Sequence, residues 1–227
     1  MEKRINYIID INFQYSKILL NYSIKNDIKF IYASSASVYG HSTNSFEDYE
    51  NENPLNLYAI SKLMFDNYVR SKIKIKSQIV GLRYFNVYGK NESHKKNMAS
   101  VIFHFNNQAK KLKKIKLFGS SHGFKNGEQK RDFVHVDDIC DVNIWFMRNN
   151  ISGIFNVGTG KANSFNHVAG LISKHYNKIK LKYVNFPKKL IKFYQPYTKA
   201  NLINLRKIGY KKNFISIENG IKRYLNE

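Results

Sequence analysis

Cysteine, proline, glycine and acidic residues are all scarce in this chain of 227 residues, which holds 1 cysteine, 3 prolines, 12 glycines and 16 aspartates and glutamates. The single Cys140 excludes an intramolecular disulfide framework and a metal site built from several cysteines, so we expect no metal centre. No apolar run approaches the roughly 18 residues that a membrane-spanning helix needs. The basic start, Met1 to Arg4, is followed by polar residues, so no secretory signal is evident. We therefore expect a cytoplasmic protein with no membrane partner.

The shortage of acidic residues leaves a strong positive charge, with 38 lysines and arginines and a formal net charge of +22. Such a charge suggests nucleic-acid binding. The basic residues, however, are spread along the whole chain. Their densest cluster, Lys110 to Lys116, lies where a helix should end, and cations are favourable there because of the helix dipole. We expect no nucleic-acid partner, although an anionic nucleotide substrate would be attracted.

One tyrosine–lysine pair, four positions apart, is distinguished from the others by the sequence that precedes it. Tyr58 is followed by Lys62, and upstream lies a strand-like segment that ends in the run Ser34–Ala36. Tyr68 and Tyr176 also have a lysine four positions further on, but neither follows such a run. Without that context, the spacing is typical of a surface pair on a helix, worth a few tenths of a kcal/mol.

The chemistry available to this pair is proton transfer. A phenol has a pKa of about 10 and is a poor base at neutral pH, but a neighbouring ammonium favours its ionised form. Lowering the pKa of Tyr58 to about 7 requires roughly 4 kcal/mol, which Lys62 and an oxidised cofactor could supply together. Ser35 could hydrogen-bond the reacting oxygen. We therefore predict Tyr58, Lys62 and Ser35 as catalytic residues that deprotonate an alcohol while a nicotinamide ring takes the hydride.

Helix-like and strand-like segments alternate along the chain, which predicts an α/β fold with a largely parallel sheet. With 43% hydrophobic residues the chain can bury a substantial core. The expected strands are Ile28–Ala33, Gln78–Phe85, Lys116–Phe118, Ile154–Val157 and Leu181–Val184. The expected helices follow Asn56, span Met98–Ala109 and Asp137–Met147, and begin after a cap at Ser164; two short helices come last.

A glycine-rich phosphate loop is missing from the front of the chain, where the first glycine is Gly40. The run Gly158–Gly160 imitates such a loop, but Asn163 stands at the third glycine position and no acidic residue follows at the ribose-binding distance. We interpret this run as a sharp turn after a strand. The chain is thus expected to be the remainder of a longer enzyme whose first βαβ units are missing.

Five motifs occur in a fixed order: Ser34-Ser35-Ala36 with Val38-Tyr39-Gly40, Tyr58-x-x-x-Lys62, Arg83-Tyr84-Phe85-Asn86-Val87-Tyr88-Gly89, Arg131-Asp132-Phe133-Val134-His135-Val136-Asp137-Asp138 and Phe155-Asn156-Val157-Gly158-Thr159-Gly160. With them the chain resembles the extended short-chain dehydrogenase/reductase family of nucleotide-sugar-modifying enzymes. The resemblance implies a Rossmann-type, mostly parallel sheet and a smaller C-terminal substrate-binding domain. The cofactor domain would hold residues 1–88 and 132–158, and the substrate domain residues 89–131 and 159–227.

Within that family the reaction type depends on a few positions. Sugar 4,6-dehydratases carry an acidic residue just after the serine or threonine of the first motif, where this chain has Ala36–Val38, so we do not expect a dehydratase. The segment from Glu92 to Val101 with His104 resembles the ADP-heptose 6-epimerase subfamily. That likeness implies that Lys95 is a second catalytic base, since an inverted ketone would turn its oxygen towards a different proton donor.

The resemblance also implies the ligand contacts. Cofactor contacts with NADP are expected from Asn12, Lys62 and Val87. Contacts with the nucleotide-sugar substrate, ADP-heptose, are expected from Ser35, Asn86, Asn97, His104, Phe118, Gly119, Ser120, Ser121, Arg131 and Tyr194. Lys96 and Asn97 stand where the family usually has small residues, and the loop from Ser121 to Lys130 is longer than usual. The family's habit of assembly implies a homo-oligomer.

The expected activity is epimerisation at C6 of ADP-D-glycero-D-manno-heptose to ADP-L-glycero-D-manno-heptose through transient oxidation, in the synthesis of lipopolysaccharide core heptose. Two alternatives stay open. One is another nucleotide-sugar epimerase, for example one that acts at C4. The other is a non-catalytic, truncated remnant that cannot bind its cofactor, because a lost phosphate loop removes several charge-assisted hydrogen bonds of about 1.5–3 kcal/mol each.

Overall fold

The structure of the chain, a computed structural model, describes residues 2–72 and 76–226. It divides into two compact units. The first unit consists of Met1–Tyr84, Cys140–Val157 and Asn201–Lys211. The second consists of Phe85–Ile139, Gly158–Ala200 and Lys212–Glu227. The chain therefore passes between the units several times.

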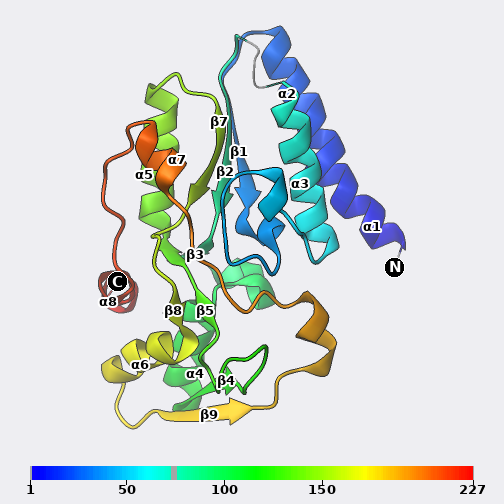
Figure 1. Cartoon of the computed structure of the whole chain (residues 1–227). Helices are drawn as coiled ribbons and strands as arrows, with labels where there is room; N and C mark the ends of the chain where they lie inside the picture. The colour runs from blue at the N-terminus through cyan, green and yellow to red at the C-terminus, as the bar shows by residue number, and fades with distance from the viewer. Residues whose placement is uncertain (1, 73–75, 227) are drawn as a thin grey trace. The chain divides into compact units, whose positions relative to one another are not determined.

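A three-stranded parallel sheet forms the centre of the first unit (Figure 1). Its strands lie in the order β1 (Phe30–Ser35), β2 (Ile79–Tyr84) and β7 (Gly153–Val157), and the register of β1 with β2 begins at Phe30 beside Ile79. The central strand β2 is buried at every position except its last. Because the strands are parallel, their carboxyl ends share one edge, which is where open α/β sheets bind ligands.

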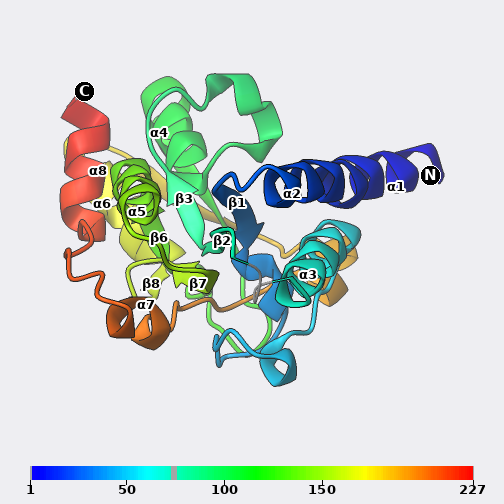
Figure 2. The same cartoon turned by 90° about the horizontal axis from the view of Figure 1, so that it is seen from above.

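Helices cover both faces of this sheet. On one side α1 (Glu2–Ile9), the π-helical segment η1 (Asp10–Tyr15) and α2 (Ser16–Lys25) form one continuous rod beside α3 (Leu57–Arg70), as Figure 2 shows. The buried apolar side chains between these helices and the sheet are Leu20, Phe65, Val69 and Ile79.

The opposite face of the sheet is covered by α5 (Val136–Arg148), whose residues from Cys140 onward belong to this unit. Val142 and Phe146 are fully buried there, and the ring centre of Phe146 lies 5.1 Å from that of Phe155 on β7. The short elements η2 (Ala36–Tyr39), η3 (Tyr49–Asn51) and α7 (Ile203–Lys207) complete the unit. The sheet is thus enclosed between two helical layers, which is the α/β arrangement that the sequence predicts.

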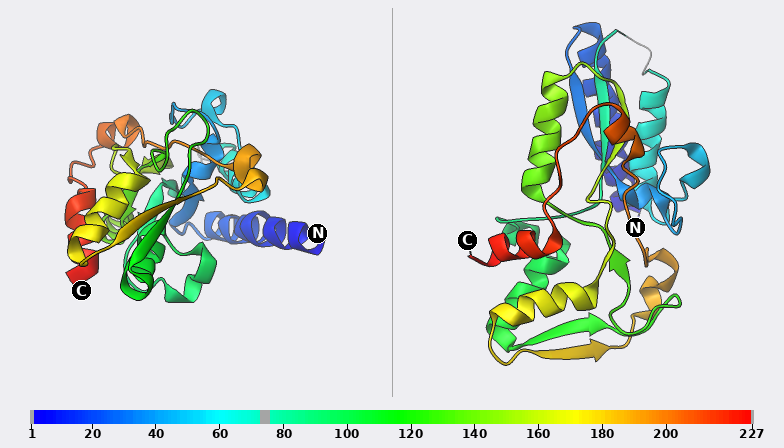
Figure 3. Two further views of the ribbon diagram at one scale, coloured as in Figure 1. Left: turned by 90° about the horizontal axis from the view of Figure 1, so that it is seen from below. Right: turned by 60° about the vertical axis from the view of Figure 1, so that its left-hand side comes forward.

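The second unit contains three two-stranded pairs: β3 (Asn86–Tyr88) parallel to β6 (Phe133–His135), β4 (Lys114–Phe118) parallel to β9 (Lys180–Val184), and β5 (Lys130–Arg131) antiparallel to β8 (Asn163–Ser164). The helices α4 (Val101–Leu112) and α6 (Phe165–His175) pack against the β4–β9 pair, as Figure 3 shows. The core of this unit includes Ile102, Phe105, Ile115 and Leu117.

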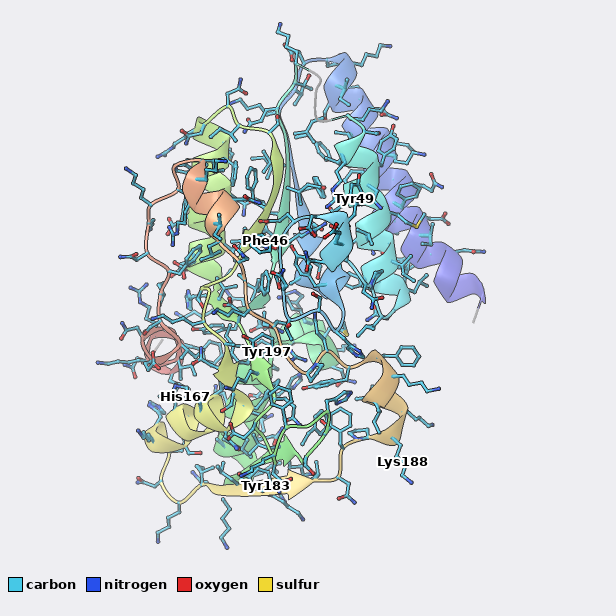
Figure 4. The ribbon with its side chains drawn as sticks, viewed as in Figure 1. Phe46, Tyr49, His167, Tyr183, Lys188 and Tyr197 are labelled. Carbon is cyan, nitrogen blue, oxygen red and sulfur yellow. The ribbon has the colours of Figure 1, made fainter. Side chains whose placement is uncertain are left out.

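Side-chain contacts hold the periphery of the second unit. The hydroxyl of Tyr183 on β9 donates to Asn166 on α6, with an O···O distance of 3.1 Å (Figure 4). His167 lies 3.0 Å from Glu218 of α8 (Ile217–Asn226). The remaining short helices are η4 (Ser93–Met98) and η5 (Lys188–Phe193).

The element types predicted from the sequence are confirmed, with boundaries shifted by a few residues. Asn56 caps α3 through its side-chain oxygen, 3.0 Å from the amide nitrogen of Ala59. Ser164 caps α6 in the same way, 3.2 Å from the amide nitrogen of His167. Among residues 2–72 and 76–226, no helix combines the length and apolar character required to cross a bilayer. The π-helical segment η1 was not foreseen, because nothing in its sequence distinguishes it from an α-helix.

Gly40 offers a test of the turn that follows the serine motif. Its φ is +56°, and a Cβ atom at this position would lie 1.7 Å from the carbonyl oxygen of Asn53. Strain and overlap together predict that Gly40→Ala lowers the free energy of unfolding by about 3 kcal/mol or more, measured by urea titration. Gly170 in α6 has nothing within 4 Å of its Cβ position. Gly170→Ala is therefore the control and should stabilise by about 0.5–1 kcal/mol; equal effects of the two changes would contradict the argument.

Candidate active site

Tyr58 and Lys62 lie one turn apart on the same face of α3. The side chain of Tyr58 is 45% exposed, and the ammonium nitrogen of Lys62 lies 5.9 Å from the centre of its ring. Within the described part of the chain, no residue hydrogen-bonds the Tyr58 hydroxyl. The phenol is therefore open to a ligand while a cation stands beside its ring.

Lys62 also joins α3 to the central sheet. Its Nζ donates to the carbonyl oxygen of Ala33 on β1, 2.9 Å away. Burial lowers the pKa of Lys62, and the charge of Asp66 opposes that effect. An ammonium has three N–H donors, so two remain for a ligand such as the hydroxyls of a ribose.

Ser35 ends β1 at the carboxyl edge of the sheet and caps η2. Its Oγ accepts hydrogen bonds from the amide nitrogen of Ser37 at 3.2 Å and from the hydroxyl of Ser37 at 2.9 Å. Both contacts use the Ser35 oxygen as acceptor, so its own hydroxyl proton remains available to donate. Since α3 packs against both β1 and η2, the structure brings Ser35 to the end of the strand that Lys62 contacts.

Asn12 lies in the π-helical segment η1. Its Nδ2 donates to the hydroxyl oxygen of Ser61 at 3.0 Å, and that hydroxyl donates to the carbonyl oxygen of Tyr58 at 2.7 Å. Single-turn π segments are rare and occur frequently at functional sites. The segment here turns Asn12 towards the part of α3 that carries Tyr58 and Lys62.

A buried carboxylate, Asp66, ties α3 to two strands. It lies one helical turn after Lys62 and is fully buried. Its Oδ1 accepts from the hydroxyl of Tyr32 at 2.8 Å, and its Oδ2 accepts from Ser34 Oγ and Arg83 Nε, both at 2.9 Å. These contacts fix the position of α3 along β1 and β2. They therefore also fix the position of Lys62 near the end of β1.

Arg83 extends this arrangement to the loop before α3. Its guanidinium is fully buried, donates to the Tyr39 hydroxyl at 3.0 Å and forms a short ion pair with Glu52. Arg70 also pairs with Glu52, and the ring of Tyr49 lies 4.3 Å from the Arg70 guanidinium carbon (Figure 4). Burial raises the pKa of Glu52, but its two arginine partners outweigh burial and hold that pKa below its usual value.

Glu52 therefore provides a pH-dependent contribution to stability. Glu52→Gln should lower the free energy of unfolding by about 3 kcal/mol at neutral pH, because the buried Arg83 and the partly buried Arg70 lose a shared partner. A carboxyl whose folded-state pKa is depressed stabilises above its unfolded-state pKa, and this contribution disappears as the pH falls through the folded-state value. The gap between wild type and variant should thus narrow in the acid range, as measured by urea unfolding. Glu50→Gln on the exposed surface is the control, and a gap independent of pH would contradict this account.

A cavity of about 480 Å³ lies within the second unit. Its walls come from α4, from the β4–β9 pair and from the segment before α5. Four residues predicted to bind substrate line it: Asn86, Phe118, Arg131 and Tyr194. Other residues that line the cavity, among them Gln129 and Phe165, were not predicted from the sequence, because neither belongs to one of the five motifs.

Arg131 is a buried charged group in the wall of this cavity. Its guanidinium carbon lies 4.8 Å from the ring centre of Tyr194 and 5.7 Å from that of Phe165. Burial lowers the pKa of Arg131, and Tyr194 opposes that effect. In the region that the structure describes, no carboxylate pairs with this arginine. A buried guanidinium with aromatic faces and no acidic partner can bind a phosphate group through paired N–H donors.

The predicted residues Gly119, Ser120 and Ser121 form the start of the loop after β4. Gln129 Nε2 donates to the carbonyl oxygen of Gly119 and to the hydroxyl of Ser121, both at 2.9 Å. The amide nitrogen of Ser120 donates to the side-chain oxygen of Asn126 at 2.7 Å. The loop, which the sequence indicated to be unusually long, is thus closed by side-chain amides at the wall of the cavity.

The sequence predicts that Gly158–Gly160 is a sharp turn and not a phosphate loop, and the hydrogen bonds of this turn agree with that prediction. Its amide groups already have a partner, because the carboxylate of Asp132 accepts from the amide nitrogen of Thr159 at 2.7 Å and from that of Gly160 at 2.8 Å. Asp132 also accepts from the amide nitrogen of Ala200 at 2.9 Å. A phosphate would have to displace this fully buried carboxylate.

Lys95, the predicted second base, lies on η4. Its side chain is 47% exposed, and its Nζ lies 3.9 Å from Glu92 Oε2. The next residue, Lys96, has φ +50° and ψ −123°, a conformation that favours glycine.

Lys96 thus provides a test of backbone strain. A non-glycine residue in such a conformation costs about 1–3 kcal/mol, whereas glycine costs roughly 0.5–1 kcal/mol in extra chain entropy. Lys96→Gly should therefore raise the free energy of unfolding by about 0.5–2 kcal/mol, measured by urea titration. Lys211→Gly, at an exposed site without positive φ, is the control and should not stabilise. A destabilised Lys96→Gly variant would show that the strain is absent.

The remaining predicted residues lie in the second unit. Val87 pairs with Val134 between β3 and β6. Asn97 lies on η4 and is exposed, and the ring of His104 contacts that of Phe103 with centres 5.6 Å apart. None of these three lines the 480 Å³ cavity.

The fold and the residue pattern together identify the class of protein. The profile of the NAD dependent epimerase/dehydratase family matches residues 2–158. The chain therefore belongs to this family. Its mixed α/β architecture with a parallel sheet agrees with that assignment.

Individual solved structures are similar over nearly the whole chain. The ADP-L-glycero-D-manno-heptose-6-epimerase of Helicobacter pylori is 35% identical, with a TM-score of 0.84 over 95% of this chain and 64% of that one. The UDP-N-acetylglucosamine 4-epimerase of Methanobrevibacter ruminantium, in complex with UDP-N-acetylmuramic acid, is 28% identical, with a TM-score of 0.79 over 96% and 69%. The UDP-glucose 4-epimerase of Thermotoga maritima, with UDP-glucose, is 25% identical, with a TM-score of 0.80 over 96% and 69%. The chain spans 64% of the length of the H. pylori enzyme.

Proposed function

We propose that this chain belongs to an epimerase that inverts C6 of ADP-D-glycero-D-manno-heptose to give ADP-L-glycero-D-manno-heptose, with NADP as cofactor. The product would be the heptose precursor of the lipopolysaccharide core. The observation that carries the proposal is the open phenol of Tyr58 beside the Lys62 ammonium, on a helix packed against the strand that ends in Ser35. The choice of substrate rests on the 35% identity with the H. pylori enzyme.

The proposed mechanism assigns one role to each side chain of the first unit. Tyr58, as phenolate, accepts the proton of the C6 hydroxyl, and the ammonium of Lys62 stabilises that phenolate. Ser35 donates its free hydroxyl proton in a hydrogen bond to the reacting oxygen, which becomes the carbonyl oxygen of a ketone. Bound nicotinamide dinucleotide supplies the hydride acceptor and afterwards the hydride donor at C6.

Inversion requires the ketone to present its other face before the carbon–hydrogen bond is remade. Its oxygen then lies away from Tyr58, and we assign the proton transfer in this second pose to Lys95. The Lys95 ammonium gives one N–H proton to the oxygen as the new C–H bond forms. A half-exposed amine has the freedom to meet a moving substrate and to regain its proton from water.

Several residues of the chain fit the nicotinamide end of a dinucleotide cofactor. Lys62 retains two N–H donors for the nicotinamide ribose, and Asn12 and Val87 are further proposed contacts. The turn at Gly158–Gly160 cannot contribute to binding of the pyrophosphate, because Asp132 occupies its amides. We propose NADP rather than NAD on the resemblance to the heptose epimerases alone.

The cavity of the second unit supports recognition of the nucleotide part of the substrate. Arg131 offers a guanidinium to the diphosphate, and the rings of Phe118 and Tyr194 offer apolar faces. The loop residues Gly119 and Ser121 are held at the wall by Gln129. We further propose a cytoplasmic homo-oligomer in which residues 1–88 and 132–158 serve the cofactor and the rest serves the substrate.

A second candidate, an epimerase that acts at C4 of a UDP-sugar, is favoured by the similarity to two UDP-sugar 4-epimerases at 28% and 25% identity. The same Tyr58 and Lys62 chemistry would serve it. The two candidates differ in the base of the nucleotide and in the need for a second proton-transfer group. Turnover of ADP-heptose compared with UDP-glucose and UDP-N-acetylglucosamine distinguishes them.

The Tyr58→Phe variant tests the proposed function. Removal of the hydroxyl should lower kcat for C6 epimerisation by about 100-fold to 10,000-fold, because the proton has no acceptor at the reacting oxygen. The measurement is conversion of ADP-D-glycero-D-manno-heptose by the whole protein with bound cofactor, followed by chromatography of the two stereoisomers. Tyr68→Phe, at another tyrosine of α3 with a lysine four positions on, is the control and should retain activity. Undiminished epimerisation by Tyr58→Phe would refute the mechanism.

A further inference from the structure

One buried carboxylate, Glu92, closes the segment that carries Lys95. Its Oε1 accepts from the hydroxyl of Ser100 at 2.7 Å and from the amide nitrogen of Gly89 at 3.3 Å. Its Oε2 accepts from the amide nitrogen of Ser100 at 2.7 Å. Glu92 is 4% exposed, and it therefore joins both ends of residues 89–100 from inside the loop.

Lys95 contacts the same residue by backbone and by side chain. Its amide nitrogen donates to the carbonyl oxygen of Glu92 at 2.9 Å, and its Nζ lies 3.9 Å from Glu92 Oε2. The ammonium remains about half exposed, so the contact orients the lysine without burying it.

The backbone of the segment is held in a conformation that needs such support. Asn91 has φ +61° and Lys96 has φ +50°, so one residue with positive φ lies before Lys95 and one lies after it. Strained positions persist only where the surrounding contacts determine them, and they cluster at functional sites. The contacts of Glu92 with Gly89 and Ser100 supply that constraint here.

We propose that Glu92 is the positioning residue of the second proton-transfer group: it fixes the loop so that Lys95 stands outside it in one orientation. This rests on the proposed function of Lys95 in C6 epimerisation. A merely structural role is the alternative, because Ser100 also caps α4 through its Oγ, 3.2 Å from the amide nitrogen of Phe103. Ser164→Ala weakens the equivalent cap of α6, where the Ser164 Oγ lies 3.2 Å from the amide nitrogen of His167, and leaves every contact of Glu92 in place, so it separates the two roles.

The first arm of the test needs no activity. Hydrogen exchange of the amides in residues 93–100, and labelling of Lys95 by a water-soluble active ester, are measured by mass spectrometry in wild type, Glu92→Gln and Glu50→Gln, with exposed Lys125 as internal reference. In Glu92→Gln we expect both exchange and Lys95 labelling to rise several-fold, because an amide side chain removes the negative charge and presents a donor to the Ser100 amide. Glu50→Gln, which removes an exposed charge, should match wild type. Unchanged exchange and labelling in Glu92→Gln would overturn the proposal.

The second arm uses the whole protein with bound cofactor. Glu92→Gln should lower kcat for epimerisation by about 10-fold to 100-fold with little change in KM, since the lysine is displaced but substrate binding is not. Ser164→Ala should retain most of kcat. Equal losses in the two variants would reduce Glu92 to a structural role and overturn the proposal. If wild type epimerises no ADP-heptose, the proposed function fails, while the first arm still decides whether Glu92 orients Lys95.

Discussion

The buried guanidinium of Arg83 is the group on which the geometry of the first unit depends. It meets Asp66 of α3, Glu52 of the loop before α3 and the Tyr39 hydroxyl of η2, all away from water. A buried charge without partners would cost several kcal/mol, so few arrangements of these elements are tolerated. The ion pairs need not add net stability compared with an apolar core to have this effect. What they impose is one level and one orientation of α3 relative to the sheet.

The candidate catalytic residues lie next to this network without belonging to it. Asp66 holds the side chains of Tyr32 and Ser34 on β1, and Lys62 holds the carbonyl oxygen of the residue between them. Three contacts on consecutive residues leave no room for the helix to shift along the strand. Tyr58 can therefore stay exposed to a ligand while the backbone beneath it is rigid. Precise proton transfer requires both an accessible side chain and a fixed backbone.

Much of this could be predicted from the sequence, and the rest depended on contacts that a sequence does not display. Caps such as Asn56, the alternation of strands and helices, and the serine run before Tyr58 are local signals, so the element types and the candidate catalytic residues could be named. The network could not. Asp66 and Arg83 are 17 residues apart, and Glu52 and Arg83 are 31 apart, so each alone resembles a solvated charge. The π-helical turn likewise depends on packing rather than on residue type.

The second unit fixes its loops with carboxylates in a different way. Among residues 2–72 and 76–226, Asp132 has no arginine partner and is satisfied by the Thr159 hydroxyl and by backbone amides, including those of Gly160 and Ala200. Burial raises the pKa of Asp132 and outweighs these hydrogen bonds, whereas the arginines of Glu52 outweigh burial. A raised folded-state pKa means that ionisation of Asp132 costs stability as the pH rises through its range, while Glu52 loses its stabilising effect as the pH falls. Protonation of Glu52 in acid therefore weakens the ion pairs that set the geometry of the first unit, whereas burial favours the protonated form of Asp132 in the second unit.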